Sequence, residues 1–94
     1  MEMTVMRITV VFAPWLNERI GIKESVIQVE AGTTLRQLFD LLVERHGKGF
    51  EDIDIAVGKH SGILVLLNNE IVMDMQRLLS DGDEISFAIP LSGG

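Results

Sequence analysis

Few residues in this sequence have the types and spacing that chemistry usually requires. His46 and His60 are too widely separated to form a helical metal-binding pair, so we expect a helix-end histidine whose charged form the helix dipole favours and a loop histidine. A metal site that joins a histidine to the acidic residues at positions 51–54 is the alternative. Residues 81–84 lack the spacing of a calcium loop and fit a tight turn before a strand. Without a phosphate-binding loop or nucleophile elbow, the sequence predicts no metal site and no self-contained active site.

The end of the sequence offers a different kind of chemistry. Gly93 and Gly94 follow a predicted strand closely, and without Cβ atoms they can pass through a narrow channel in almost any backbone conformation. An α-carboxylate has a pKa of about 3.5, so that of Gly94 is ionised at neutral pH and can attack an electrophilic phosphorus. These properties suit a carboxylate that is activated inside the pocket of another protein. A tail that ends in two glycines by chance is the alternative.

The elements that must carry this tail begin with two strands and a helix. Apolar residues alternate over residues 6–12, which predicts a strand with Phe12 on its core face, and residues 25–30 form a second strand. Thr34 begins the clearest helix, because its hydroxyl can accept from the backbone of Gln37 while the Gln37 side chain reaches back. Four apolar residues then recur at helical spacing and predict one buried stripe: Leu35, Leu38, Phe39 and Leu42.

The second half of the chain predicts three further strands. Residues 47–62 read mostly as a loop that could include a short helix, and residues 63–67 as a central strand covered on both faces, because they lack alternation. Residues 71–73 form a short strand, and residues 84–89 form the last one, with Phe87 facing the core. The order predicts an α+β fold of the β-grasp (ubiquitin-like) type, a mixed sheet of five strands with one main helix across it, since a helical crossover implies a parallel neighbour.

Length and composition limit the classes of function. Ninety-four residues, 47% of them hydrophobic, predict one globular domain, and the absence of cysteine excludes disulfides, thiolate zinc sites and cysteine nucleophiles. The net charge of −6 argues against nucleic acid and suits either a basic protein partner or solubility alone. No apolar run approaches the roughly 20 residues that span a bilayer, and no signal-peptide pattern begins the sequence. We therefore expect a cytoplasmic protein without membrane contact.

Short motifs in a fixed order resemble those of the MoaD/ThiS family of sulfur carriers, most closely the small subunit of molybdopterin synthase. The resemblance begins at Met6 and covers nearly all of the chain beyond it. It therefore implies an N-terminal extension at residues 1–5, a β-grasp domain at residues 6–91 and a flexible tail at residues 92–94. The motifs are LNERIG at residues 16–21, AGTTL at 31–35, LNNEIV at 67–72, LSDGDEI at 79–85 and the final GG.

The resemblance also implies a mechanism in which the carrier itself is not an enzyme and binds no cofactor. An adenylating enzyme of the ubiquitin-activating type would bind ATP and the tail, and the Gly94 carboxylate would attack the α-phosphate. Sulfur from a persulfide would then replace AMP and leave a thiocarboxylate. In the molybdopterin branch, a larger synthase subunit accepts this tail and uses the sulfur to build the dithiolene of the molybdenum cofactor.

The sequence departs from the molybdopterin branch at two positions. Ala13 and Ala88 stand where that branch usually carries outward aromatic residues that touch partners, and buried aromatics often anchor interfaces. A carrier for thiazole, a thiolated tRNA base or an amino acid therefore stays open, as does a ubiquitin-like modifier or interaction module. In each case the resemblance implies that partners contact the tail and its surroundings, through Ala13, Ile71, Ala88, Pro90, Leu91 and Ser92.

Overall fold

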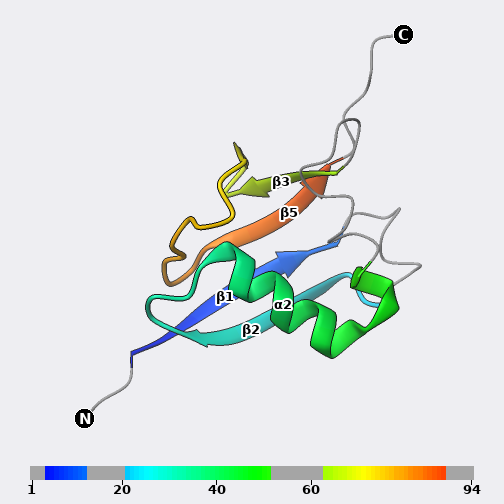
Figure 1. Ribbon diagram of the computed structural model, residues 1–94, viewed down its shortest axis with the longest axis horizontal. Coiled ribbons are helices and arrows are strands. Elements are labelled where there is room, and N and C mark those ends of the chain that lie inside the picture. Colours follow the sequence, from blue (N-terminus) through cyan, green and yellow to red (C-terminus); the bar gives the residue numbers. More distant parts are fainter. Residues whose placement is uncertain (1–3, 13–20, 52–62, 89–94) are drawn as a thin grey trace, which may run out of the picture.

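The computed structural model describes residues 4–12, 21–51 and 63–88 (Figure 1). Its strands form a single sheet in the order β2-β1-β5-β3-β4, and one main helix, α2, lies across one face of that sheet. The predicted α+β, β-grasp fold is confirmed. The elements follow the chain as β1 (Val5–Val11), β2 (Glu24–Glu30), α2 (Leu35–His46), β3 (Leu64–Leu67), β4 (Glu70–Val72) and β5 (Glu84–Ala88).

The sheet is mixed because the last strand returns to its centre. β1 pairs antiparallel with β2, and parallel with β5 through the pairs Thr9–Glu84 and Val10–Ile85. The sequence predicts one pair of parallel neighbours joined by a helical crossover. β2 and β3, which α2 connects, are not neighbours in the sheet, and the parallel pair is formed by β1 and β5. Because parallel strands end at the same edge of a sheet, the end of β5 lies beside the end of β1. Ala88, the last residue of β5, therefore lies at the edge of the sheet where β1 ends.

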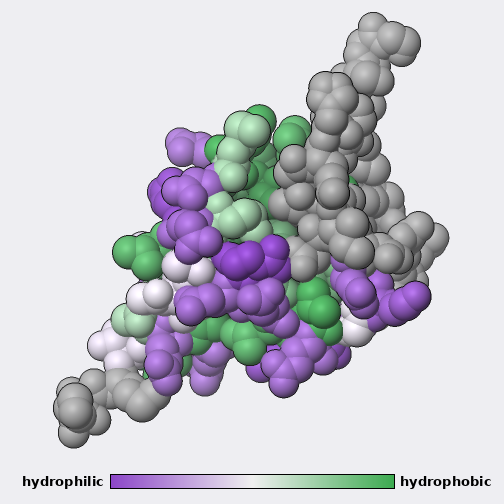
Figure 2. Space-filling model, in the orientation of Figure 1, coloured by the Kyte–Doolittle hydropathy of each residue, from purple (hydrophilic) through white to green (hydrophobic). Residues whose placement is uncertain are grey.

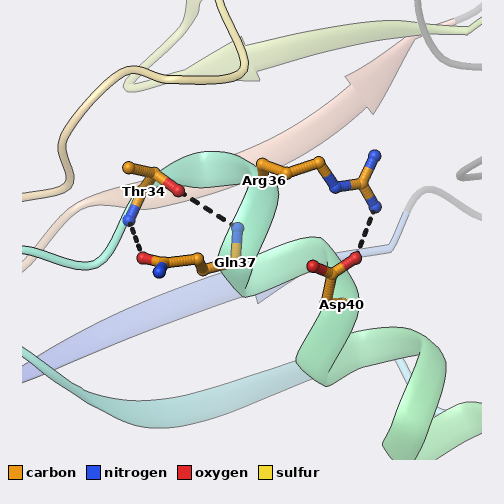
Figure 3. A network of polar contacts seen from close by, with 4 residues as sticks. All are labelled: Thr34, Arg36, Gln37 and Asp40. Carbon is orange, nitrogen blue, oxygen red and sulfur yellow. Dashed lines mark hydrogen bonds and ion pairs between the residues drawn. The ribbon is translucent and has the colours of Figure 1, made fainter.

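Helix α2 begins where the sequence predicts and for the predicted reason (Figure 3). The hydroxyl of Thr34 accepts from the Gln37 N–H (3.2 Å), and the Thr34 N–H donates to Gln37 Oε1 (2.9 Å), which completes a capping box. Arg36 and Asp40 form an ion pair one turn further on (2.9 Å). The four residues of the predicted stripe are buried, and Gly47 ends the helix with a positive φ of 60°.

The core is built around the four phenylalanines of the sequence. Phe87 lies at the centre of this group: its ring stacks on Phe12 at 6.2 Å and lies 5.9 Å from Phe39 and 5.8 Å from Phe50 between centroids. The predicted inward orientation of Phe12 and Phe87 is confirmed, since they are 3% and 4% exposed. Phe50 is fully buried and comes from a helical turn at residues 48–51, so the predicted loop begins with helix and contributes to the core.

Strand β3 corrects one prediction. The sequence predicts that residues 63–67 are covered on both faces, but burial alternates along β3: Val65 and Leu67 are buried, and Leu64 and Leu66 are half-buried. In the described part of the chain, α2 covers only one face of the sheet (Figure 1). The absence of alternation in the sequence therefore reflects a second face of β3 that is apolar and that no described element covers, not a second covered face.

Candidate functional site

The structure describes Ile71 and Ala88 among the residues that the sequence predicts at the tail and the partner surface. Ile71 lies in β4 and is 58% exposed, whereas Ala88 ends β5 and is half-buried. The described site is thus the strand that leads to the tail and the sheet face around these two residues. The remaining predictions lie outside the described residues: Ala13, Pro90, Leu91, Ser92, Gly93 and Gly94.

Hydrogen bonds from β1 hold the turn that begins β5. The Arg7 N–H donates to Asp81 Oδ1 (2.8 Å), and the Gly82 N–H donates to the Arg7 carbonyl (2.9 Å). The Thr9 N–H donates to the Asp83 carbonyl (3.0 Å). These three bonds determine where β5 begins and, after its five residues, where the strand ends at Ala88.

The carboxylate of Asp83 also stabilises this turn through hydrogen bonds. Asp83 is 8% exposed, and its Oδ1 accepts from Asn68 Nδ2 (2.9 Å) while its Oδ2 accepts from the Ser80 N–H (2.7 Å). The Asn68 side chain in turn accepts from the Glu84 N–H (2.9 Å). The interpretation of residues 81–84 as a tight turn is confirmed. Within residues 4–12, 21–51 and 63–88, no group of three or more His, Asp or Glu residues is placed to hold a metal ion.

The sheet face opposite α2 carries apolar side chains close to the end of β5. Ala88 pairs with Leu64, and Ile71 pairs with Leu66, two positions further along β3. Because side chains two residues apart share a face, these four residues lie together on the open side of the sheet. We call Leu64, Leu66, Ile71 and Ala88 the open-face patch. It brings together the two described partner-surface predictions and adds two leucines, which the sequence signals only through the missing alternation of β3.

An apolar patch with one exposed member, Ile71, and three half-buried members near the end of β5 fits docking to another protein. Solvent-exposed apolar clusters commonly mark interaction sites, and aliphatic side chains such as Ile71 lose unfavourable hydration when a partner covers them. The patch has no charged member, so it offers a partner shape and apolar surface rather than charge.

Comparison with known proteins decides the family. The sequence model of the ThiS family matches residues 10–94, which is most of the chain and includes both terminal glycines. This chain belongs to the ThiS family. Membership makes it a sulfur carrier or a ubiquitin-like modifier with the β-grasp fold.

Solved structures agree with this assignment. SAMP1 from Haloferax volcanii is 25% identical, with a TM-score of 0.73 over 94% of this chain and 99% of that one. A chain of the BexX/CysO complex from Amycolatopsis orientalis is 27% identical, with a TM-score of 0.66 over 93% and 99%. A chain of the complex of molybdopterin-converting factor subunits 1 and 2 from Helicobacter pylori 26695 is 24% identical, with a TM-score of 0.65 over 95% and 100%, and shows the shared fold alone. No curated protein sequence matches this chain.

This ThiS-family domain places His46 beside the aromatic core at the end of α2. Its ring lies edge-on to Phe12 at 5.9 Å, and the buried Nε2 atom has no hydrogen-bond partner among the described residues. Burial, with a smaller contribution from the charge of Arg45, lowers the pKa of His46. The expectation that the helix dipole favours the charged form is wrong here, because desolvation of the imidazolium outweighs the dipole. No described helix of this domain is long and apolar enough to cross a membrane.

The lowered pKa of His46 predicts a loss of stability in acid. Because the unfolded chain takes up the proton near pH 6.5 and the folded domain only at lower pH, this stability is complete above about pH 6.5 and is lost as pH falls below it. We expect the melting temperature of His46→Gln to fall less than that of the wild type between about pH 7 and pH 5. Thermal unfolding followed by circular dichroism measures this, with His60→Gln as the matched control. Equal slopes for His46→Gln and wild type would contradict the assignment.

Proposed function

We propose that this chain carries sulfur as a thiocarboxylate on Gly94 and delivers it in molybdopterin (molybdenum cofactor) biosynthesis. The observation that carries the proposal is the ThiS-family match, which extends through the final Gly93–Gly94. Strand β5 supports it, since hydrogen bonds at its start and the Phe87 cluster at its end hold the strand from which the tail continues.

The chemistry begins with activation of the tail. An adenylating enzyme of the ubiquitin-activating type binds ATP, the Gly94 carboxylate oxygen attacks the α-phosphorus, and pyrophosphate leaves. A persulfide sulfur on a donor protein then attacks the acyl carbon and displaces AMP, which forms an acyl persulfide. A thiol then attacks the donor's own sulfur atom and forms a disulfide with the donor. The sulfur bound to the acyl carbon is released with the carrier, so that Gly94 ends in a thiocarboxylate. The catalytic groups and the nucleotide site belong to the partners in this scheme.

The open-face patch supplies the docking surface for these partners. Ile71 and Ala88 contact the partner from the sheet, while the remaining contacts come from Ala13 and the tail residues Pro90, Leu91 and Ser92. The acceptor we propose is a synthase large subunit, because the sequence motifs most closely resemble those of the small subunit of molybdopterin synthase. Alanine at positions 13 and 88 makes this contact smaller than an aromatic pair would.

A ubiquitin-like modifier is the second candidate, and a specific observation favours it. SAMP1, whose name abbreviates small archaeal modifier protein 1, is 25% identical to this chain over almost its full length. A modifier would use the same Gly94 adenylate but pass its acyl group to a lysine amine. The two functions share the activating step and differ in the nucleophile that follows.

The first test is the intact mass of the protein after incubation with ATP, an activating enzyme and a persulfide donor. We expect a gain equal to the exchange of one oxygen for sulfur, mapped to Gly94 by fragmentation. Thiocarboxylate that converts the precursor to molybdopterin with the synthase large subunit supports the pathway as well as the carrier. Slower-migrating lysine adducts without any thiocarboxylate would replace the carrier with the modifier.

A further inference from the structure

Strand β2 leaves a long edge of the sheet unpaired. It lies at the end of the strand order β2-β1-β5-β3-β4, and its seven residues from Glu24 to Glu30 pair only with β1 in the described part of the chain. Figure 1 shows β2 along the lower border of the sheet, with α2 on one side and no strand beyond it. An edge of this kind presents backbone donors and acceptors that another strand can use.

The hydrogen bonds at the two ends of β2 show which backbone groups point outward. The Phe12 N–H donates to the Lys23 carbonyl (2.7 Å), and the Ala31 N–H donates to the Thr4 carbonyl (2.9 Å). Since the direction of these groups alternates along an antiparallel strand, the odd-numbered residues of β2 bond to β1 and the even-numbered residues point away from it. The N–H and C=O groups of Glu24, Val26 and Gln28 therefore face outward and have no partner among the described residues.

The side chains on this edge are acidic at both ends and apolar between them. Glu24, Val26, Gln28 and Glu30 are all exposed on the open face of the sheet, and Val26 is 56% exposed. These side chains lie on the far side of Figure 2, which shows the α2 side of the molecule with hydrophilic and hydrophobic residues mixed. A strand added here would place alternate side chains directly beside these four.

A shallow acidic groove adjoins the β2–α2 turn on the helix side. It has a volume of about 320 Å³ and is lined by Thr33, Gln37, Asp40, Leu41 and Glu44. Thr33 connects the groove to β2, because its N–H (3.2 Å) and its hydroxyl (2.7 Å) both donate to the Glu30 carbonyl. Asp40 forms an ion pair with Arg36, and Glu44 contributes a second carboxylate to the groove.

We propose that the β2 edge binds an extended segment of a partner protein that adds a sixth strand and carries a Lys or Arg opposite Glu24 and Glu30. An aliphatic residue of that segment covers Val26, and its backbone bonds to the outward groups of Val26 and Gln28. Main-chain bonds supply the attachment in this mode of recognition, and the side chains supply its selectivity.

The same charges disfavour a second copy of this chain as the occupant. The antiparallel register that pairs the whole of β2 with itself places Glu24 of each copy opposite Glu30 of the other. Like charges directly opposite one another destabilise a strand pair, and each copy carries a net charge of −6. The edge therefore selects a basic segment and resists self-pairing.

This surface is separate from the proposed docking surface of the tail. The open-face patch lies on β3, β4 and the end of β5, and β1 stands between β5 and β2 in the sheet. A partner strand on β2 consequently leaves the open-face patch accessible. The edge gives this ThiS-family member a second contact, with a protein that need not bind the tail.

The test measures binding of a capped synthetic peptide to the full chain. The peptide carries lysine opposite Glu24 and Glu30, valine opposite Val26 and threonine elsewhere. We expect saturable binding, with amide NMR shifts concentrated at β2, and weaker binding at higher salt because the contacts are charged. A peptide in which glutamate replaces both lysines should not bind the wild type. The same peptide should bind the Glu24→Lys/Glu30→Lys variant.

Gln28→Pro and Gln28→Ala form the matched pair of variants. Proline removes an N–H that points outward, so it breaks no bond to β1, whereas alanine shortens the side chain and keeps the N–H. We expect Gln28→Pro to weaken peptide binding by roughly ten-fold or more and Gln28→Ala to leave it nearly unchanged. Thermal unfolding of both variants shows whether the domain itself is preserved.

Peptide N-methylation gives a readout that does not depend on any variant. Methyl groups on the alternate amides that face β2 should abolish binding, and methyl groups on the other alternate amides should not. No binding, or equal binding of the two methylated isomers, would overturn the proposal. Shifts centred on the open-face patch, or dimerisation of the chain through β2 in sedimentation, would overturn it as well.

Discussion

Deletion of Gly94 is expected to abolish thiocarboxylate formation completely and to leave the folded domain unchanged. The deletion moves the terminal carboxylate one residue back, so an activating pocket built for the full tail no longer holds it against the α-phosphate of ATP. The described core runs from Met6 to Phe87, and we therefore expect the same melting temperature as for the wild type. Intact mass after the activation reaction and thermal unfolding measure the two parts of this prediction.

Extension of the chain separates the position of the carboxylate from the loss of a residue. One glycine added after Gly94 should be as inactive as the deletion, whereas one glycine added before Met1 is the matched control and should be fully active. Thiocarboxylate on the shortened chain would exclude Gly94 as the reacting residue. A large drop in melting temperature would show instead that the tail is part of the fold.

Replacement of Phe87 by alanine is expected to give the largest loss of stability. Phe87 is 4% exposed and contacts the rings of Phe12, Phe39 and Phe50, so its removal leaves a cavity that three other rings line. Truncation of a buried phenylalanine costs about 3–5 kcal/mol. Because small domains are stable by only about 5–15 kcal/mol in total, we expect Phe87→Ala to be at the margin of folding. Chemical denaturation measures the free energy of unfolding directly.

The control for this variant lies in the same strand. Ser86 faces the opposite side of the sheet and is half-buried opposite Leu66, so Ser86→Ala should change the free energy of unfolding by less than about 0.5 kcal/mol. Similar losses for Ser86→Ala and Phe87→Ala would mean that the inward and outward residues of β5 are assigned to the wrong faces.

Features that depend on neighbours in the chain could be predicted from the sequence. Thr34 and Gln37 form the predicted capping box, and Ser80 and Asp83 bond within the predicted turn, because each of these pairs is only three residues apart. Phe12 and Phe87 face the core because residues of a strand alternate between its faces. The terminal glycines likewise point to tail chemistry through their own backbone and carboxylate.

Features that depend on residues far apart in the chain were decided only by the tertiary structure. The sequence predicts a parallel pair but not that β1 and β5 form it, since this depends on how the last strand inserts between β1 and β3. Phe50 joins the core because Phe39 and Phe87 meet it there. His46 has a lowered pKa because packing on Phe12 buries it, which its place at a helix end does not reveal.

For the two proposed partner surfaces, too, part could be predicted from the sequence and part was decided by the tertiary structure. Ile71 and Ala88 could be chosen from the sequence, but only the pairing of β3 with β4 and β5 unites them with Leu64 and Leu66 in one patch. The β2 edge has no sequence signal, because a strand at the border of a sheet and one in its interior have the same alternation. Sequence thus determined the order of the elements and the core faces of β1, α2 and β5. Tertiary structure decided which strands are neighbours and which surfaces remain open, because those depend on contacts between residues distant in the chain.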